Sequence, residues 1–168
     1  VALNFRRLTD LKTSLNKGTV GSLLPVFNTA SEVGYGAIIA SLPAFFVVRD
    51  AVLGLTDNPL INVAVATNVL AGITGSASGG MSIALEALGT RFAEMAQQAG
   101  ISEQLMHRIT TLSSGGFDAL PHNGAVITLL GICGLTHRQS YGDIFVVAVA
   151  IPVFATMVAI ALGTMGIV

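Results

Sequence analysis

The sequence predicts an all-α integral membrane protein, a helical bundle with discontinuous helices and a re-entrant hairpin, forming a single membrane domain over residues 1–168. Of its 168 residues, 52% are hydrophobic and only 10% are charged, whereas an ordinary soluble domain is about 25% charged. Residues 144–168 carry no charge over a length that suffices to cross a bilayer. The other apolar segments are interrupted near their middles by glycine, serine and other polar residues.

Composition also excludes several classes of protein. The net charge is −1 and no basic stripe is present, so we expect no nucleic-acid partner. The single cysteine, Cys133, lies in an apolar run and offers neither a disulfide framework nor a thiolate metal site. The three histidines are spaced fifteen residues apart and form no recognisable metal-ligand motif. We therefore expect no metal and no cofactor.

The first 17 residues are polar and basic, with Arg6, Arg7, Lys12 and Lys17 among them. This pattern is typical of a cytoplasmic loop between membrane segments under the positive-inside rule. The start lacks an initiator methionine and the pattern of a signal peptide. We interpret the sequence as the C-terminal fragment of a longer membrane protein.

Residues 18–48 form an apolar segment that is longer than one simple membrane span needs. The middle of this segment is polar and contains Asn28, Thr29 and Glu32. We predict one helix that breaks at residues 28–32 and then resumes. The alternative is two short helices joined by a surface loop. A carboxylate at membrane depth is costly, so Glu32 is a candidate functional residue.

Residues 59–88 are predicted to form a re-entrant hairpin. Asn58 followed by Pro59 is typical of a helix start, with a cap and a proline at the first helical position. The glycine- and serine-rich stretch 70–82 divides the segment into limbs of about 12 and 8 residues, each too short to cross a bilayer at 1.5 Å per residue. The charge distribution favours a hairpin that opens from the exterior.

The remaining chain is predicted to contain three further elements. Residues 91–112 form one or two interfacial helices with a break near Gly100. Residues 113–135 form a second broken span, followed by a polar loop at 136–143. Residues 144–168 form a transmembrane helix that Pro152 kinks.

The tip of the hairpin is the first candidate binding site. If a helix restarts near Gly80, the free N–H groups of its first turn and its dipole favour an anion such as a carboxylate. Glycines allow close approach of that anion, and serine hydroxyls add hydrogen bonds. The alternative is close helix packing through Gly75 and Gly79. The candidate binding residues here are Thr74, Gly75, Ser76, Ser78, Gly79 and Gly80.

The second broken span provides a second candidate site. Pro121 disfavours a helical conformation at Leu120, and Asn123 can cap a helix that begins at Gly124. We expect this helix start to face the hairpin tip, and Asn28 and Thr29 to join the same binding region. His122, Asp118 and Glu32 are the candidates for proton coupling, because such groups inside a membrane often relay protons. A hydrogen-bonded structural histidine is the alternative for His122.

Enzyme motifs fail on spacing, so we expect no enzyme. The stretch Gly75–Gly79 has Ala77 at its centre, where a nucleophile elbow needs a serine, and no lysine follows for a phosphate-binding loop. An intramembrane serine protease using Ser78 and His122 remains a minor alternative. Interrupted helices that meet at the membrane midplane instead favour a secondary transporter. A channel or a non-transporting membrane subunit also remains open.

Three stretches of this chain resemble one known family. GITGSASGGMSIALEAL, DALPHNGAVITLL and LPVFNTASEVGYGAII are similar to the C-terminal half of the gluconate permease (GntP) family, within the ion transporter superfamily. The resemblance implies half of a two-repeat, multi-pass carrier in the bacterial inner (plasma) membrane. Its partners would be a small organic-acid anion, protons and lipid, and a homodimer is possible.

The resemblance also implies a function, import of a hydroxy-carboxylate by proton symport. Gluconate-type members tend to have a bulkier residue where this chain has Ser78-Gly79-Gly80, which favours a shorter acid such as hydroxybutyrate. Sodium coupling is the alternative, since unwound backbone carbonyls also suit that ion.

Overall fold

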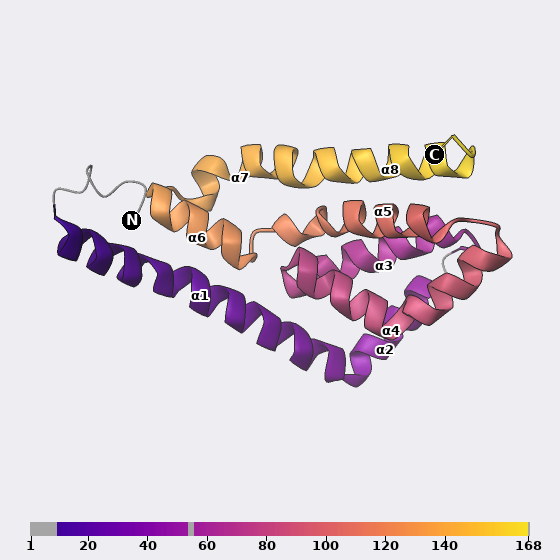
Figure 1. The fold of residues 1–168 in the computed structure, drawn as a ribbon, viewed down its shortest axis with the longest axis horizontal. Coiled ribbons are helices and arrows are strands. Elements are labelled where there is room, and N and C mark those ends of the chain that lie inside the picture. The colour runs from indigo at the N-terminus through magenta and orange to yellow at the C-terminus, as the bar shows by residue number, and fades with distance from the viewer. Residues whose placement is uncertain (1–9, 54–55, 168) are drawn as a thin grey trace.

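The computed structural model describes residues 10–53 and 56–167, apart from the side chains at positions 28, 29, 32, 33, 36, 40, 49 and 53. Every regular element in these ranges is helical, as predicted (Figure 1). In chain order the elements are α1 (Leu11–Ser41), α2 (Pro43–Leu53), α3 (Pro59–Thr74), α4 (Ala77–Gln98), α5 (Glu103–Ser114), η2 (Phe117–Ala119), α6 (Gly124–Cys133), α7 (His137–Phe145), η3 (Val146–Ala150) and α8 (Ile151–Thr164).

The predicted break at residues 28–32 is wrong. Helix α1 runs without interruption through these positions, and the break lies at Leu42, which is extended with φ −80° and ψ 142°. Pro43 explains the location, because a proline disfavours a helical conformation of the residue before it. The low helix propensity of the polar residues at 28–32 destabilises a helix by only about a few tenths of a kcal/mol per residue. That cost is too small to end a helix.

Helices α3 and α4 form an antiparallel hairpin around a turn at Gly75 and Ser76. Its start follows the prediction, because the Asn58 side chain caps α3 and Pro59 occupies the first turn. The limbs of 16 and 22 residues are longer than expected, and α4 continues beyond the predicted boundary at residue 88. The predicted break near Gly100 separates α4 from α5, where Ser102 caps the new helix.

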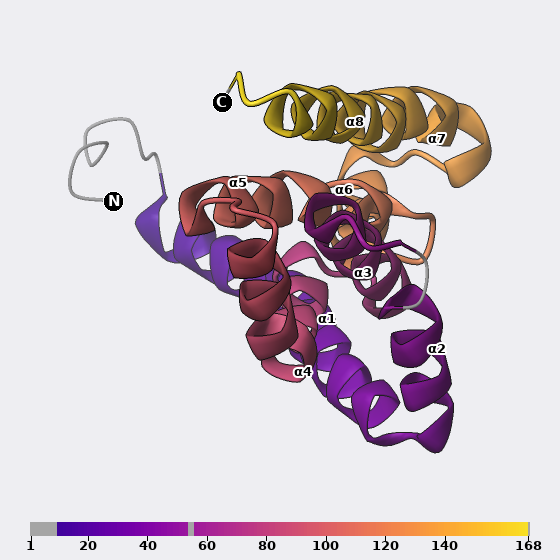
Figure 2. The same ribbon diagram turned by 90° about the vertical axis from the view of Figure 1, so that its right-hand side faces the viewer.

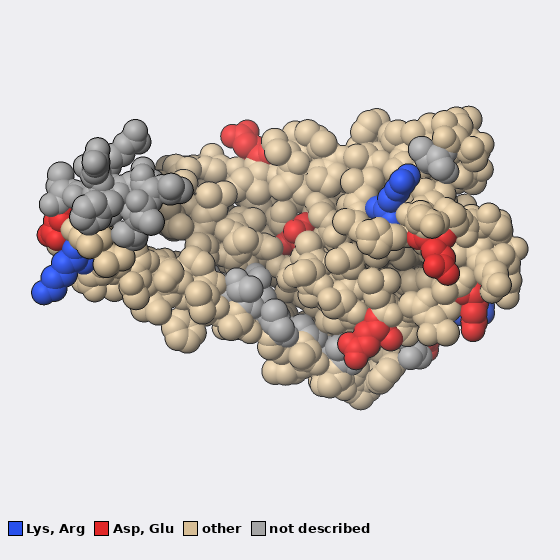
Figure 3. Space-filling view, viewed as in Figure 1, with Lys and Arg blue, Asp and Glu red and all other residues tan. Residues whose placement is uncertain are grey.

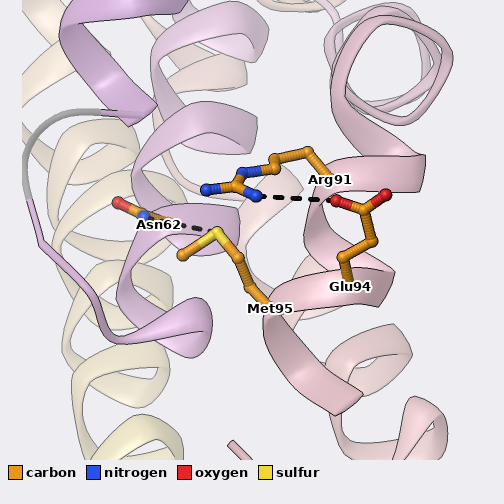
Figure 4. A network of polar contacts seen from close by, with 4 residues as sticks. All are labelled: Asn62, Arg91, Glu94 and Met95. Carbon is orange, nitrogen blue, oxygen red and sulfur yellow. Dashed lines mark hydrogen bonds and ion pairs between the residues drawn. The ribbon is translucent and has the colours of Figure 1, made fainter. Parts of the chain in front are cut away.

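One polar contact, between Asn62 and Met95, joins the two limbs of the hairpin near the start of α3 (Figure 4). The Asn62 amide on α3 donates to the sulfur of Met95 on α4 at 3.9 Å and to the Thr56 carbonyl oxygen at 2.6 Å. Arg91 and Glu94 form an exposed ion pair along α4, with 3.5 Å between nitrogen and oxygen.

Helix α3 is the centre of the molecule. It packs against α1, α2, α4, α5, η2 and α8, and Figures 1 and 2 both show it surrounded by other helices. The main hydrophobic core lies between α3, α4 and α5, where Leu60, Val63, Phe92 and Ile109 are at most 3% exposed. The hairpin tip follows the C-terminal end of α3, at Gly75.

The chain from His137 to Thr164 is helical throughout and is the candidate membrane span among the described residues. It is 28 residues long, and only 11% of its most apolar window is buried inside the molecule. The predicted polar loop at 136–143 is wrong, because Thr136 and Gln139 form a capping box that starts α7. The π-helical segment η3 immediately precedes Ile151 and Pro152. A local change of helix type is expected here, because Pro152 has no N–H to donate to the preceding turn.

Charged side chains are few on the face drawn in Figure 3, and wide uncharged areas separate them. Large apolar side chains are exposed along α1, α6 and α8, including Phe27, Ile132 and Phe154. Extended exposed apolar surface is typical of a face that contacts lipid or another protein.

Candidate functional site

The candidate site lies where the α3–α4 turn meets the segment between η2 and α6. Gly75 ends α3 with a left-handed backbone, φ 65° and ψ 26°. The following N–H, that of Ser76, donates back to the Ala71 carbonyl at 3.2 Å. A residue with a Cβ is strained in this conformation, so the turn favours glycine.

Helix α4 begins three residues earlier than the sequence suggested. The Ser76 side chain caps it by accepting from the Gly79 N–H at 3.2 Å, and the Gly80 N–H donates to the Ser76 carbonyl at 2.9 Å. The N–H groups of Gly79 and Gly80 are therefore engaged and are not the free donors that were predicted. As the first two residues of the helix, Ala77 and Ser78 instead have N–H groups that no carbonyl of α4 can accept.

The packing interpretation of the tip named the wrong glycines, because the close contact between α3 and α4 lies at Gly80. Gly80 is buried, and a Cβ there would overlap the backbone of Ala71 and lie 2.7 Å from the carbonyl carbon of Leu70. Close packing of α3 on α4 thus depends on Gly80, whereas the sequence had indicated Gly75 and Gly79. The Thr74 hydroxyl is also buried, and it donates to the Leu70 carbonyl at 2.8 Å.

The second break has the predicted local structure. Leu120 is extended ahead of Pro121, with ψ 161°. Asn123 is 6% exposed and caps α6, since its Oδ1 accepts from the Val126 N–H at 2.8 Å. Gly124 is buried as the first residue of α6.

Side chains from one segment bind the backbone of the other. The Asn123 Nδ2 donates to the Gly75 carbonyl at 2.7 Å, and the His122 Nε2 lies 2.8 Å from the Gly72 carbonyl oxygen. A carbonyl can only accept, so Nε2 carries the hydrogen in this contact. Asn68, one helical turn before Gly72, accepts from the Phe117 N–H at 3.3 Å. These contacts join the hairpin tip to the second break, as the sequence had led us to expect.

Helix α7 holds the second break from its other side. The His137 Nε2 contacts the Pro121 carbonyl oxygen at 2.9 Å, and the Tyr141 hydroxyl donates to the Ala119 carbonyl at 3.0 Å. Their ring centroids are 6.0 Å apart. This pair is not among the predicted site residues, because residues 136–143 are polar and resemble a loop in the sequence. The four-residue spacing of His137 and Tyr141 could have indicated a helix with both rings on one face.

An open pocket of about 500 Å³ adjoins the junction. Its lining comes from α1, the end of α3 and the second break, and consists of Ser31, Tyr35, Gly72, Ile73, Thr74 and His122. Ser31 and Tyr35 were not among the predicted site residues. His122 is exposed at this pocket while its Nε2 is bound to Gly72.

The other predicted residues are placed as follows. Ser78 is exposed near the start of α4, and Asp118 is half-buried in η2. The backbones of Asn28, Thr29 and Glu32 belong to α1, but their side chains lie outside the described residues. No group of three or more His, Cys, Asp or Glu side chains suited to a metal ion occurs within the described parts of the chain.

The chain is similar to a protein of Bacillus subtilis (strain 168) named "Uncharacterized transporter YxjC", with 52% identity over 138 residues. The similarity covers 82% of this chain and 29% of that protein, so the chain spans less than a third of its relative's length. No family model and no solved structure matches the chain. The name of that relative describes it as a transporter. The described part of this chain is all-helical and contains one helix that is long and apolar enough to cross a membrane.

Proposed function

We propose that this chain forms part of a secondary active transporter that imports a small hydroxy-carboxylate, gluconate-like or hydroxybutyrate-like, by proton symport across the bacterial inner membrane. The observation that carries the proposal is the junction between the two helix breaks. There, Asn123 and His122 bind the backbone of the hairpin tip beside an open pocket. Interrupted helices that meet in this way form the substrate sites of many secondary transporters.

The carboxylate of the substrate would bind at the tip. The first N–H groups of α4, on Ala77 and Ser78, and the dipole of this 22-residue helix favour an anion. The Ser78 hydroxyl is exposed and adds a donor, while Ser76 shapes the helix start. Of the other predicted binding residues, Thr74 lines the adjoining pocket, whereas Gly79 and Gly80 use their N–H groups within the start of α4. Gly75, Gly124, Asn28 and Thr29 remain predicted binding residues.

The role of Asn123 changes with the geometry. Both ends of its side-chain amide are already used, one by Val126 and one by Gly75. We therefore propose that Asn123 locks the two breaks together, which differs from the direct contact with substrate that the sequence suggested. Locking of this kind preorganises a site so that less ordering is required when the ligand binds.

His122 would carry the coupled proton. Its Nε2–H is held by Gly72, so the neutral ring exposes Nδ1 as the atom that accepts a proton. Asp118 and Glu32 remain predicted coupling residues. Sodium coupling and serine protease chemistry have less support. The carbonyls of Gly72 and Gly75 each accept one hydrogen bond already, which makes them weaker ligands for sodium, and a serine would have to use the Nδ1 of His122 because its Nε2 is bound to Gly72.

The test is uptake into vesicles that contain the full-length transporter. Labelled 3-hydroxybutyrate and gluconate are supplied with an imposed proton gradient and no sodium, then with a sodium gradient and no proton gradient. We expect accumulation of one of these acids under the proton gradient only. The variant His122→Gln keeps a donor for the Gly72 carbonyl but cannot take up a proton. It is expected to exchange substrate without accumulating it.

The matched control is His107→Gln, an exposed histidine on α5 outside the junction. It is expected to accumulate substrate at the wild-type rate. Accumulation driven only by sodium, or flux without accumulation in the wild-type protein, would contradict proton symport. Wild-type accumulation in His122→Gln would remove His122 from the mechanism.

A further inference from the structure

The pocket beside the junction has a second polar wall that no assignment above uses. Ser31 and Tyr35 are four residues apart on α1, so they lie on one face of that helix. The opposite wall is formed by Gly72, Ile73, Thr74 and His122. Two hydroxyl groups of α1 therefore line the same pocket as the last residues of α3, which lead directly into the tip where the proposed carboxylate would bind.

The Ser31 hydroxyl differs from the hydroxyls of Ser22 and Ser41 on the same helix, although Ser14 near the start of the helix also forms no side-chain hydrogen bond with a described residue. Ser22 and Ser41 donate to the backbone carbonyls three residues before them, at 2.8 and 2.7 Å, as serines in helices commonly do. Ser31 forms no hydrogen bond with any described residue, and neither does the Tyr35 hydroxyl, although Tyr35 is 54% exposed. Both hydroxyls are thus available to a ligand in the pocket.

We infer that Ser31 and Tyr35 bind the hydroxyl group of the substrate, and so select hydroxylated carboxylates over the same acids without a hydroxyl. This inference rests on the proposed function and deepens it. A ligand with its carboxylate at the tip would extend into the pocket that Ser31 and Tyr35 line together with His122. A site built to hydrogen-bond a hydroxyl rejects an analogue that lacks it, because polar groups of the protein are then left unpaired.

The experiment compares 3-hydroxybutyrate with butyrate, which differ only in the hydroxyl group. Binding of each acid to the detergent-solubilised full-length protein is measured by calorimetry, and uptake by vesicle assay. Ser31→Ala and Tyr35→Phe are each expected to weaken 3-hydroxybutyrate binding by about 2- to 12-fold, the value of one net hydrogen bond. Butyrate binding is expected to stay unchanged. The matched control Ser22→Ala, on the same helix and away from the pocket, should leave both affinities unchanged.

The outcomes separate the two claims. If the wild-type protein prefers 3-hydroxybutyrate but both variants keep that preference, or lose affinity equally for both acids, this inference is overturned and the transporter proposal stands. If the wild-type protein binds 3-hydroxybutyrate selectively, the two variants lose that preference and the wild-type protein does not accumulate the acid, the transport mechanism fails and the assignment of Ser31 and Tyr35 holds. Equal binding of the two acids by the wild-type protein overturns the inference directly.

Discussion

Asn123 and Gly75 show how single residues bring together parts of the chain that are 48 positions apart. The Asn123 side chain ends one interruption by capping α6, and its remaining amide group binds the carbonyl at the other interruption. A capping asparagine usually needs only its oxygen for the cap. The free nitrogen is what allows this residue to connect two helix breaks.

Gly80 provides the first prediction, at the scale of one residue. Gly80→Ala would place a methyl group against the backbone of Ala71 and push α3 away from α4, so we expect a loss of about 1–3 kcal/mol of stability. Gly89→Ala, on the same helix with open space around it, should stabilise by about 0.5–1 kcal/mol because alanine favours helix. Thermal unfolding in detergent, followed by circular dichroism, compares the two variants. Equal midpoints would show that the hairpin limbs do not pack as closely as described.

The start of helix α1 provides a prediction at the scale of an element. The Thr13 hydroxyl donates a hydrogen bond to the Asp10 carboxylate at 2.6 Å. The Thr13 N–H donates to the same carboxylate at 3.1 Å. These hydrogen bonds lower the pKa of Asp10 from its ordinary value of 3.8, the hydroxyl having the larger effect. Because the pKa is lowered on folding, the cap contributes stability above pH 3.8 and loses it as the pH falls through the lowered value.

Titration of the Asp10 carboxyl carbon by NMR tests this cap. Thr13→Val removes the hydroxyl donor and should raise the Asp10 pKa toward its ordinary value. Asp10→Asn keeps an oxygen acceptor for the N–H of Thr13 but does not titrate. Protection of the first amides of α1 in this variant should therefore not change across the acid range. An unchanged Asp10 pKa in Thr13→Val would refute the role of the hydroxyl.

Helix α7 shows what an element contributes beyond its own sequence pattern. Its residues are polar, and alone they resemble a connection between two apolar segments. The capping box at Thr136 and Gln139 starts a helix there, and that helix places His137 and Tyr141 against the second break. Ala119 is buried and its carbonyl needs such a donor, because an unpaired buried carbonyl costs free energy comparable to a lost hydrogen bond. Pro121 is exposed, so its contact with His137 mainly orients the segment.

At the scale of the whole molecule, the long helix from His137 to Thr164 predicts insertion into a membrane. Val147 and Ile151 are exposed on one face near its middle, at 66% and 56%. Replacing both with aspartate should cost about 5–7 kcal/mol of insertion free energy if this face contacts lipid. Thr164→Asp with Met165→Asp, at the end of the helix, should cost much less.

A glycosylation reporter that scores insertion of residues 137–165 by the translocon makes this comparison. The central pair should abolish insertion, and the terminal pair should leave it largely intact. Equal insertion of both pairs would mean that these exposed apolar residues do not face lipid.

Local chemistry made several features of this protein predictable from sequence. Asn58 with Pro59, the interruption at Gly75 and Ser76, the cap at Asn123 and the apolar helix before the C-terminal end all follow from residue types within a few positions of one another. The break was predicted at residues 28–32 because these residues are polar, whereas it lies at Leu42 because Pro43 disfavours a helical conformation there.

Only the tertiary structure decided how these pieces form a site. The sequence alone determined an all-helical, lipid-compatible chain with interrupted helices, since hydrophobic content and caps act locally. It could not determine that Asn123 binds Gly75, that α7 supports the second break, or that Ser31 and Tyr35 line a pocket with His122. Such contacts join residues far apart in the chain, and they exist because α3 packs at the centre and brings α1, the tip and the second break around one point.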